Sequence, residues 1–165
     1  MATNQRPDPG QRQEPWEQLY RYWLSKCVEG RFPARADLDP LIEIPQLAQH
    51  LILLDVLPEG LRYRLAGSML SSRLGAELTG NQVGRSTATE SKWLDLLSTV
   101  AREQKPMMVT SDAFTTGVGR RLGVILPLVD RSGKTECILC GIFFDRDFGP
   151  GMQIGNLSVE EISFR

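Results

Sequence analysis

Apolar residues recur with the three- and four-residue spacing of an amphipathic helix in two segments, 15–29 and 91–104. In the first segment Pro15 suits the first helical position, and Gly30 suits the position just past the end. Its apolar stripe consists of Trp16, Leu19, Tyr20, Trp23, Leu24, Cys27 and Val28. The stripe of the second segment consists of Trp93, Leu96, Leu97 and Val100. We therefore predict two amphipathic helices, the second ending before Pro106.

Strand patterns occupy five further segments: 51–57, 61–66, 107–114, 120–129 and 135–144. Pro58-Glu59-Gly60 joins the first two as a hairpin turn. A helical turn around 44–50 and a short helix capped by Ser68 complete the pattern. The first and last strands are apolar on both faces, which predicts a sheet covered on both sides there. Helices within 68–104 can cover one side; helix 15–29, from this chain or a partner chain, is the candidate for the other.

Length and composition indicate a single domain. The chain has 165 residues, of which 41% are hydrophobic and 24% charged. A net charge of −1 gives no general field for nucleic acid, and no apolar run approaches the roughly 20 residues of a membrane span. We expect a cytoplasmic protein with neither a nucleic-acid nor a membrane partner. It divides into a disordered tail (1–13), an N-terminal amphipathic helix (14–30), a domain (31–148) and a C-terminal extension (149–165).

The three cysteines carry no metal or disulfide pattern. An odd, low count argues against a disulfide framework. Cys137 and Cys140 lie three residues apart on a predicted strand, so their side chains point to opposite faces. No second cysteine pair follows that would complete a zinc site. We interpret all three, Cys27 included, as free thiols.

Catalytic motifs are incomplete. Gly67-Ser68-Met69 lacks the second glycine of a nucleophile elbow and a histidine partner. Asp55, in an apolar strand, is either a hydrogen-bonded strand-end carboxylate, which we favour, or the polar anchor of a pocket. Arg62, Arg64 and the pair Arg120-Arg121 are interpreted as solvated strand faces. Because no titratable groups are placed together, we predict that the protein is not an enzyme.

The order of these elements resembles that of a PAS domain, and several motifs resemble a stand-alone bacterial PAS-type family common in alphaproteobacteria. The motifs, within residues 16–145, are Asp37–Pro40, Leu54-Asp55-Val56, Arg62–Ser68, Leu78-Thr79-Gly80 and Leu126-Pro127-Leu128. The resemblance implies an α+β fold with a five-stranded antiparallel sheet in the order 2-1-5-4-3. It also implies a sensory or regulatory role in signal transduction, often as a dimer, with the signal passed to an unidentified downstream protein.

The same resemblance places a ligand pocket between the sheet and the helices of 68–104. Its predicted lining is Asp55, Tyr63, Leu65, Met69, Leu70, Trp93, Leu97, Val100 and Leu126. Helix 91–104 has no histidine and no Asn-Cys-Arg segment occurs, so heme and covalent flavin are disfavoured and the ligand is unidentified. The aromatic stripe of the first helix predicts a homodimer interface at Trp16, Leu19, Tyr20, Trp23, Leu24 and Cys27. The alternative is a ligand-free protein–protein interaction module.

Overall fold

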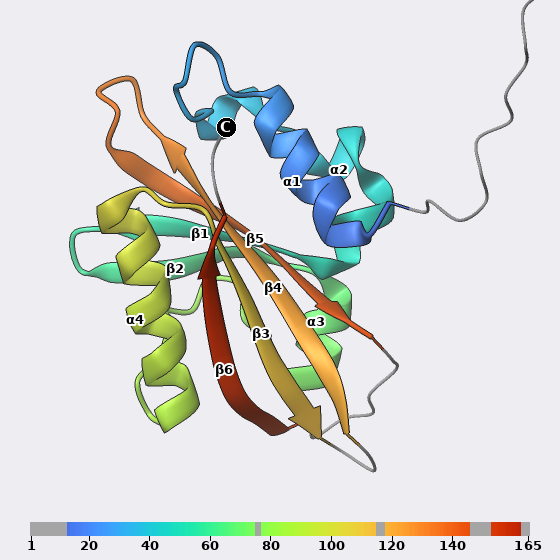
Figure 1. The fold of residues 1–165 in the computed structure, drawn as a ribbon. Helices are drawn as coiled ribbons and strands as arrows, with labels where there is room; N and C mark the ends of the chain where they lie inside the picture. The colour runs from blue at the N-terminus through green and yellow to red at the C-terminus, as the bar shows by residue number, and fades with distance from the viewer. Residues whose placement is uncertain (1–12, 75–76, 115–117, 146–152, 163–165) are drawn as a thin grey trace, which may run out of the picture.

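The computed structural model describes residues 13–74, 77–114, 118–145 and 153–162 and centres on one antiparallel sheet (Figure 1). Six strands in this part of the chain lie in the order β2-β1-β5-β4-β3-β6. They are β1 Leu51–Leu57, β2 Gly60–Ala66, β3 Met107–Phe114, β4 Val118–Val129, β5 Thr135–Phe144 and β6 Gln153–Glu161. The predicted order 2-1-5-4-3 is confirmed for the first five strands. The predicted number is corrected, because the C-terminal extension contributes β6, which pairs with β3.

Helices cover both faces of this sheet. They are α1 Pro15–Ser25, α2 Pro40–Glu43, α3 Ser68–Leu74 and α4 Ala88–Glu103, with 3₁₀ turns at Arg35–Asp37 and Pro45–His50. α4 begins at a capping box, in which the Thr87 side chain accepts a hydrogen bond from the backbone N–H of Glu90. No helix in the described ranges is long and apolar enough to cross a membrane.

The first helix is shorter than predicted. α1 ends at Ser25, four residues before the expected end, and the chain then turns through Glu29 and Gly30, which adopt left-handed φ values of 51° and 76°. Val28 and Arg31 exchange backbone hydrogen bonds across this turn. Val28 is therefore 67% exposed and does not belong to the buried stripe.

α1 packs on its own sheet, which decides between the two arrangements left open by the sequence. Leu19 and Trp23 are fully buried, and the Trp23 indole N–H donates to the Pro127 carbonyl at 3.0 Å. A Cβ at Gly141 of β5 would lie 2.4 Å from Leu19 Cδ2, so the helix can approach only a glycine here. The assignment of Leu19 and Trp23 to a dimer interface is therefore wrong, since both belong to the core of the monomer.

A polar cluster joins α1 to α2. The Lys26 ammonium donates to Glu43 Oε1 at 2.5 Å, and the Tyr22 hydroxyl donates to Glu43 Oε2. These two bonds, with a third from the Asp39 backbone N–H, hold the pKa of Glu43 at about 2. Burial, and then the bond to Glu43, raises the pKa of Tyr22. The cluster fixes the segment that follows α1 against α2.

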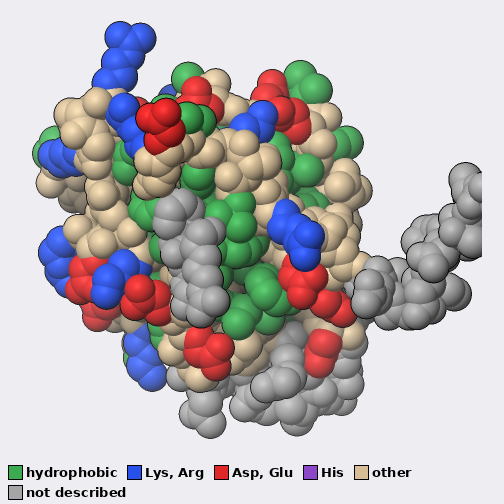
Figure 2. All heavy atoms as spheres, turned by 45° about the horizontal axis from the view of Figure 1, so that its top comes forward, with side chains coloured by type: hydrophobic (Ala, Val, Ile, Leu, Met, Phe, Trp, Pro, Cys, Tyr) green, Lys and Arg blue, Asp and Glu red, His purple; other side chains and the backbone are tan. Residues whose placement is uncertain are grey.

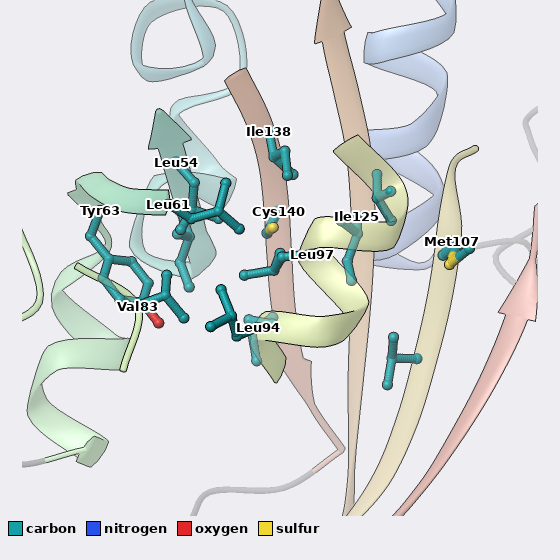
Figure 3. Packing of buried hydrophobic residues seen from close by; sticks show 14 of the residues in the cluster. Leu54, Leu61, Tyr63, Val83, Leu94, Leu97, Met107, Ile125, Ile138 and Cys140 are labelled. Atoms are coloured by element: carbon teal, nitrogen blue, oxygen red, sulfur yellow. The ribbon is translucent and has the colours of Figure 1, made fainter. Parts of the chain in front are cut away.

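Two buried clusters lie on opposite sides of the sheet, and Figure 3 shows the one beneath α4. We call the side covered by α3 and α4 the α4 face; its buried residues are Ile52, Leu54, Leu61, Tyr63, Leu70, Val83, Leu94, Leu97, Val100, Met107, Val109, Ile125, Ile138, Cys140 and Ile142. The opposite side is the α1 face, with Leu19, Trp23, Leu38, Ile44, Leu47, Leu51, Leu53, Val124, Leu126, Leu128, Cys137, Leu139 and Phe143. β1, β4 and β5 contribute apolar side chains to both faces, as their two-sided apolar patterns require.

Candidate functional site

The structure gathers part of the predicted pocket on the α4 face. Tyr63, Leu70, Leu97 and Val100 are buried there, and Trp93 packs against them. In Figure 3 Leu97 extends from α4 toward Cys140 of β5. Met69 is half-buried on α3.

Three predicted pocket residues lie elsewhere. Leu65 and Leu126 belong to the α1 face, and Asp55 lines a separate pocket, so their assignment to one cavity with Trp93 is wrong. The cause for Leu65 is a β-bulge: Leu53 pairs with Leu65 but Leu54 pairs with Tyr63, which leaves Arg64 as the extra residue. From Leu65 onward, the β2 side chains therefore point to the face opposite to the one that simple alternation from Leu61 and Tyr63 predicts.

One polar contact on the α4 face joins α4 to β2. The Trp93 indole N–H donates to the Tyr63 hydroxyl at 3.1 Å. Burial raises the pKa of Tyr63, and the bond from Trp93 opposes this rise. The phenol is therefore neutral at physiological pH, and its own O–H can donate to a further acceptor.

A second polar contact on the same face joins β3 to β4. Ser111 and Arg121 are directly opposite in the register, and Arg121 Nε donates to Ser111 Oγ at 2.9 Å. Two-residue alternation places Arg121 on the same side as Ile125, and Ser111 on the same side as Val109. Ser111 is 4% exposed, and burial lowers the pKa of Arg121 to about 10. The interpretation of Arg121 as a solvated strand residue is therefore wrong.

The guanidinium of Arg121 has N–H donors that its bond to Ser111 does not use. It carries five N–H donors, of which Nε–H serves Ser111. Among the described residues, no carboxylate forms an ion pair with it. A partly buried cation without a counter-ion is costly, so this group is suited to receive an anion.

The α1 face carries a polar pocket at the Asp55 end of the sheet. It is open to solvent, has a volume of about 320 Å³, and is lined by Arg35, Asp55, Leu57, Arg62, Arg64, Glu136 and Cys137. Asp55 forms ion pairs with Arg62 at 3.1 Å and Arg64 at 3.6 Å. It is thus a partnered carboxylate at the end of β1, as the favoured interpretation held, and also a pocket residue.

The cysteines are free, and the two on β5 lie on opposite faces as predicted. Burial raises the pKa of Cys27 to about 11, and burial followed by the charge of Asp55 raises that of Cys137 to about 11. Burial also raises the pKa of Cys140 well above its usual value. The thiols are therefore protonated at neutral pH and poor nucleophiles. Among the described residues, no three His, Cys, Asp or Glu side chains are grouped to hold a metal ion.

Comparison with known proteins identifies the family. No curated protein matches the chain. A solved structure from work on a flavin analogue in a light-oxygen-voltage domain is 15% identical, covers 68% of this chain and 89% of its own, and has a TM-score of 0.48. The family model described as a PAS domain matches residues 11–143. Since this match spans most of the chain, the protein belongs to the PAS domain family.

Proposed function

We propose that this PAS domain is a cytoplasmic sensor rather than an enzyme, and that it binds a small molecule with an anionic end on the α4 face. The observation that carries this proposal is the contact between Ser111 and Arg121. It places a guanidinium with unused donors on the same side of the sheet as the mainly apolar cluster that packs between the sheet and α4. Small-molecule sites are typically apolar with a few convergent polar groups.

The ligand class follows from these polar groups. A carboxylate or similar oxyanion can accept two parallel hydrogen bonds from the edge of the Arg121 guanidinium. The apolar body of the ligand would lie along the side chains of α4 and the central strands. We therefore favour amphipathic organic anions over neutral or cationic ligands.

The signal would leave the site through the central strands. Ile125 of β4 and Ile138 of β5 belong to the α4 face, whereas the adjacent Val124 and Leu139 pack on the side of α1. A ligand that prefers one arrangement of sheet and α4 would thus shift how α1 docks. We propose that a partner protein, or a second copy of this chain, reads this change.

The surface for that partner includes the half-buried side chains of the α1 segment: Trp16, Tyr20, Leu24 and Cys27. Figure 2 turns the top of Figure 1 toward the reader. It shows hydrophobic side chains at the surface, with charged side chains around them. Aromatic side chains at the centre of a surface patch are typical of protein–protein interfaces. Homodimerisation through these four residues remains our prediction.

Thermal shift with a panel of apolar carboxylates tests the proposal. We expect a ligand at one hundred times its Kd to stabilise the wild-type protein by about 2.7 kcal/mol. At about 2–4 °C per kcal/mol, Tm should rise by about 5–10 °C. Arg121→Met, which keeps the bulk and removes the charge, should lose this shift. Arg102→Met is the matched control because its side chain is 72% exposed, and it should respond like the wild type. An equal shift in Arg121→Met would contradict the proposal.

A second candidate, the ligand-free interaction module, is favoured by one observation: Leu97 and Val100 are 0% exposed, as in a packed core. Under this alternative Leu97→Ala should cost the full core penalty of about 2–5 kcal/mol, and no compound should restore the loss. Under the sensor proposal the loss should lie near the lower end, and a ligand should offset it. Denaturant unfolding with and without the carboxylate panel separates the two.

A further inference from the structure

The pocket on the α1 face is built from three distant parts of the chain. Arg35 comes from the 3₁₀ turn after α1, Asp55 and Arg64 come from the β1–β2 hairpin, and Glu136 comes from β5. Arg62 and Arg64 lie two residues apart on β2, and both reach the same Asp55 carboxylate. The fold thus brings three guanidinium groups to one open pocket of about 320 Å³.

The charges of this pocket do not cancel. Three arginines face two carboxylates in the lining, so the formal charge is +1. Both carboxylates are already engaged: Asp55 pairs with Arg62 and Arg64, and Glu136 Oε1 accepts the backbone N–H of Arg35 at 3.0 Å. Asp55 is 14% exposed at its side chain, whereas the two β2 arginines are 46% and 53% exposed and thus accessible to a ligand.

Arg35 is the one of the three guanidinium groups with a buried donor that lacks a partner. Its Nη1 donates to the Leu38 carbonyl at 2.8 Å, but its buried Nε has no hydrogen-bond partner. None of the described carboxylate side chains forms an ion pair with it. A buried donor left unsatisfied costs free energy, and an anion bound beside Arg35 would offset the positive charge of its guanidinium group.

We infer that this pocket binds a phosphoryl group, held by Arg35, Arg62 and Arg64. Guanidinium groups match the geometry of phosphate oxygens, and a tetrahedral oxyanion can accept from three of them at once, which a planar carboxylate cannot do as well. Asp55 competes with the ligand for the two β2 arginines and so sets a modest affinity. The group belongs either to a small phosphate ester or to a phosphorylated side chain of a partner protein.

Calorimetric titration of the full chain with inorganic phosphate, at constant ionic strength, tests the inference. We expect saturable binding to the wild type that chloride does not reproduce. Arg64→Gln should weaken it about tenfold, since one charge-assisted contact is lost. Arg64 is the arginine to change because it is half exposed and its contact with Asp55 is the longer one, so the fold should tolerate the change. Arg102→Gln is the exposed control and should bind as the wild type does.

Asp55→Asn changes phosphate affinity in a way that is not expected if the ion pairs of Asp55 are purely structural. It removes the competing carboxylate, so phosphate should bind more tightly than to the wild type. Arg121→Met should keep the saturable phosphate binding that Arg64→Gln weakens, which separates this site from the ligand site on the α4 face. A phosphoserine peptide that binds far more tightly than both inorganic phosphate and the unphosphorylated peptide would identify a protein source. Equal affinity for peptide and inorganic phosphate would identify a small molecule.

The inference is overturned if phosphate does not bind saturably, or if Arg64→Gln and Asp55→Asn both bind like the wild type.

Discussion

The close approach of α1 to β5 predicts a compensating pair of substitutions. A Cβ added at Gly141 would lie 2.4 Å from Leu19 Cδ2 and 2.8 Å from the Phe143 ring, whereas carbon atoms in good contact are about 3.5–4.0 Å apart. Gly141→Ala should therefore overpack the α1 face and cost about 1–3 kcal/mol. Leu19→Ala alone leaves a cavity and should cost about 2–5 kcal/mol. In the double variant the new methyl group enters the space left by Leu19, so the combined loss should be smaller than the sum by about 1 kcal/mol or more.

Denaturant unfolding of the wild type, both single variants and the double variant measures this coupling. Gly123→Ala is the matched control, because its Cβ would approach Ile142 Cδ1 at 3.3 Å on the opposite face. Its effect should add to that of Leu19→Ala within about 0.5 kcal/mol. The midpoints should not depend on protein concentration, since α1 docks within one chain. Additive losses for the Gly141 and Leu19 pair would refute the packing argument, and a midpoint that rises with concentration would show docking on a second chain.

Three further predictions test other parts of the structure. Gly67→Ala should unfold the domain or lower its stability severely, because a Cβ would lie 2.2 Å from the backbone oxygen of Gln49; expression level and circular dichroism check this. Thr87→Ala removes the side-chain cap of α4 and should cost about 0.5–2 kcal/mol in denaturant unfolding, with Thr87→Ser close to the wild type. The bonds that lower the pKa of Glu43 to about 2 stabilise the fold fully above its ordinary value of 4.5, and this contribution is lost as pH falls from 4.5 toward 2. Glu43→Gln should flatten the pH dependence of Tm in that window, and an unchanged profile would contradict the assignment.

The sequence predicted the strongly periodic elements well. Strand β5 has the predicted bounds, and β1 and β3 do as well, because apolar runs bounded by turn residues identify buried strands. β6 was missed because its sequence, QIGNLSVEE, interrupts the alternation with glycine and asparagine and ends in two acidic residues. Only pairing with β3 makes this segment a strand.

The faces of the strands were harder to predict than their positions. β1, β4 and β5 are apolar on both sides, so alternation carries no information about which residues face α4; Leu126 was assigned to the wrong side for this reason. The bulge at Arg64 puts the Leu65 side chain on the opposite face of the sheet, and no turn residue in the sequence indicates the bulge. The charge of Arg121 predicts a solvated side chain, whereas the register places it beside the buried Ser111 and leaves it only partly exposed. That register depends on strand pairing, which local sequence does not specify.

The central claim is that the α4 face holds a small anionic ligand anchored by Arg121. Mass spectrometry under non-denaturing conditions, on protein isolated from the cells that produce it, tests this most directly. We predict that the native wild-type protein has a mass above that of its chain and that denaturation returns it to the mass of the chain. The denatured sample should release an acidic compound whose mass equals the difference between the two. Arg121→Met prepared in parallel should carry none of it, whereas Arg102→Met should carry the wild-type amount. The bare chain mass for the wild type, or the same adduct on Arg121→Met, would contradict the claim.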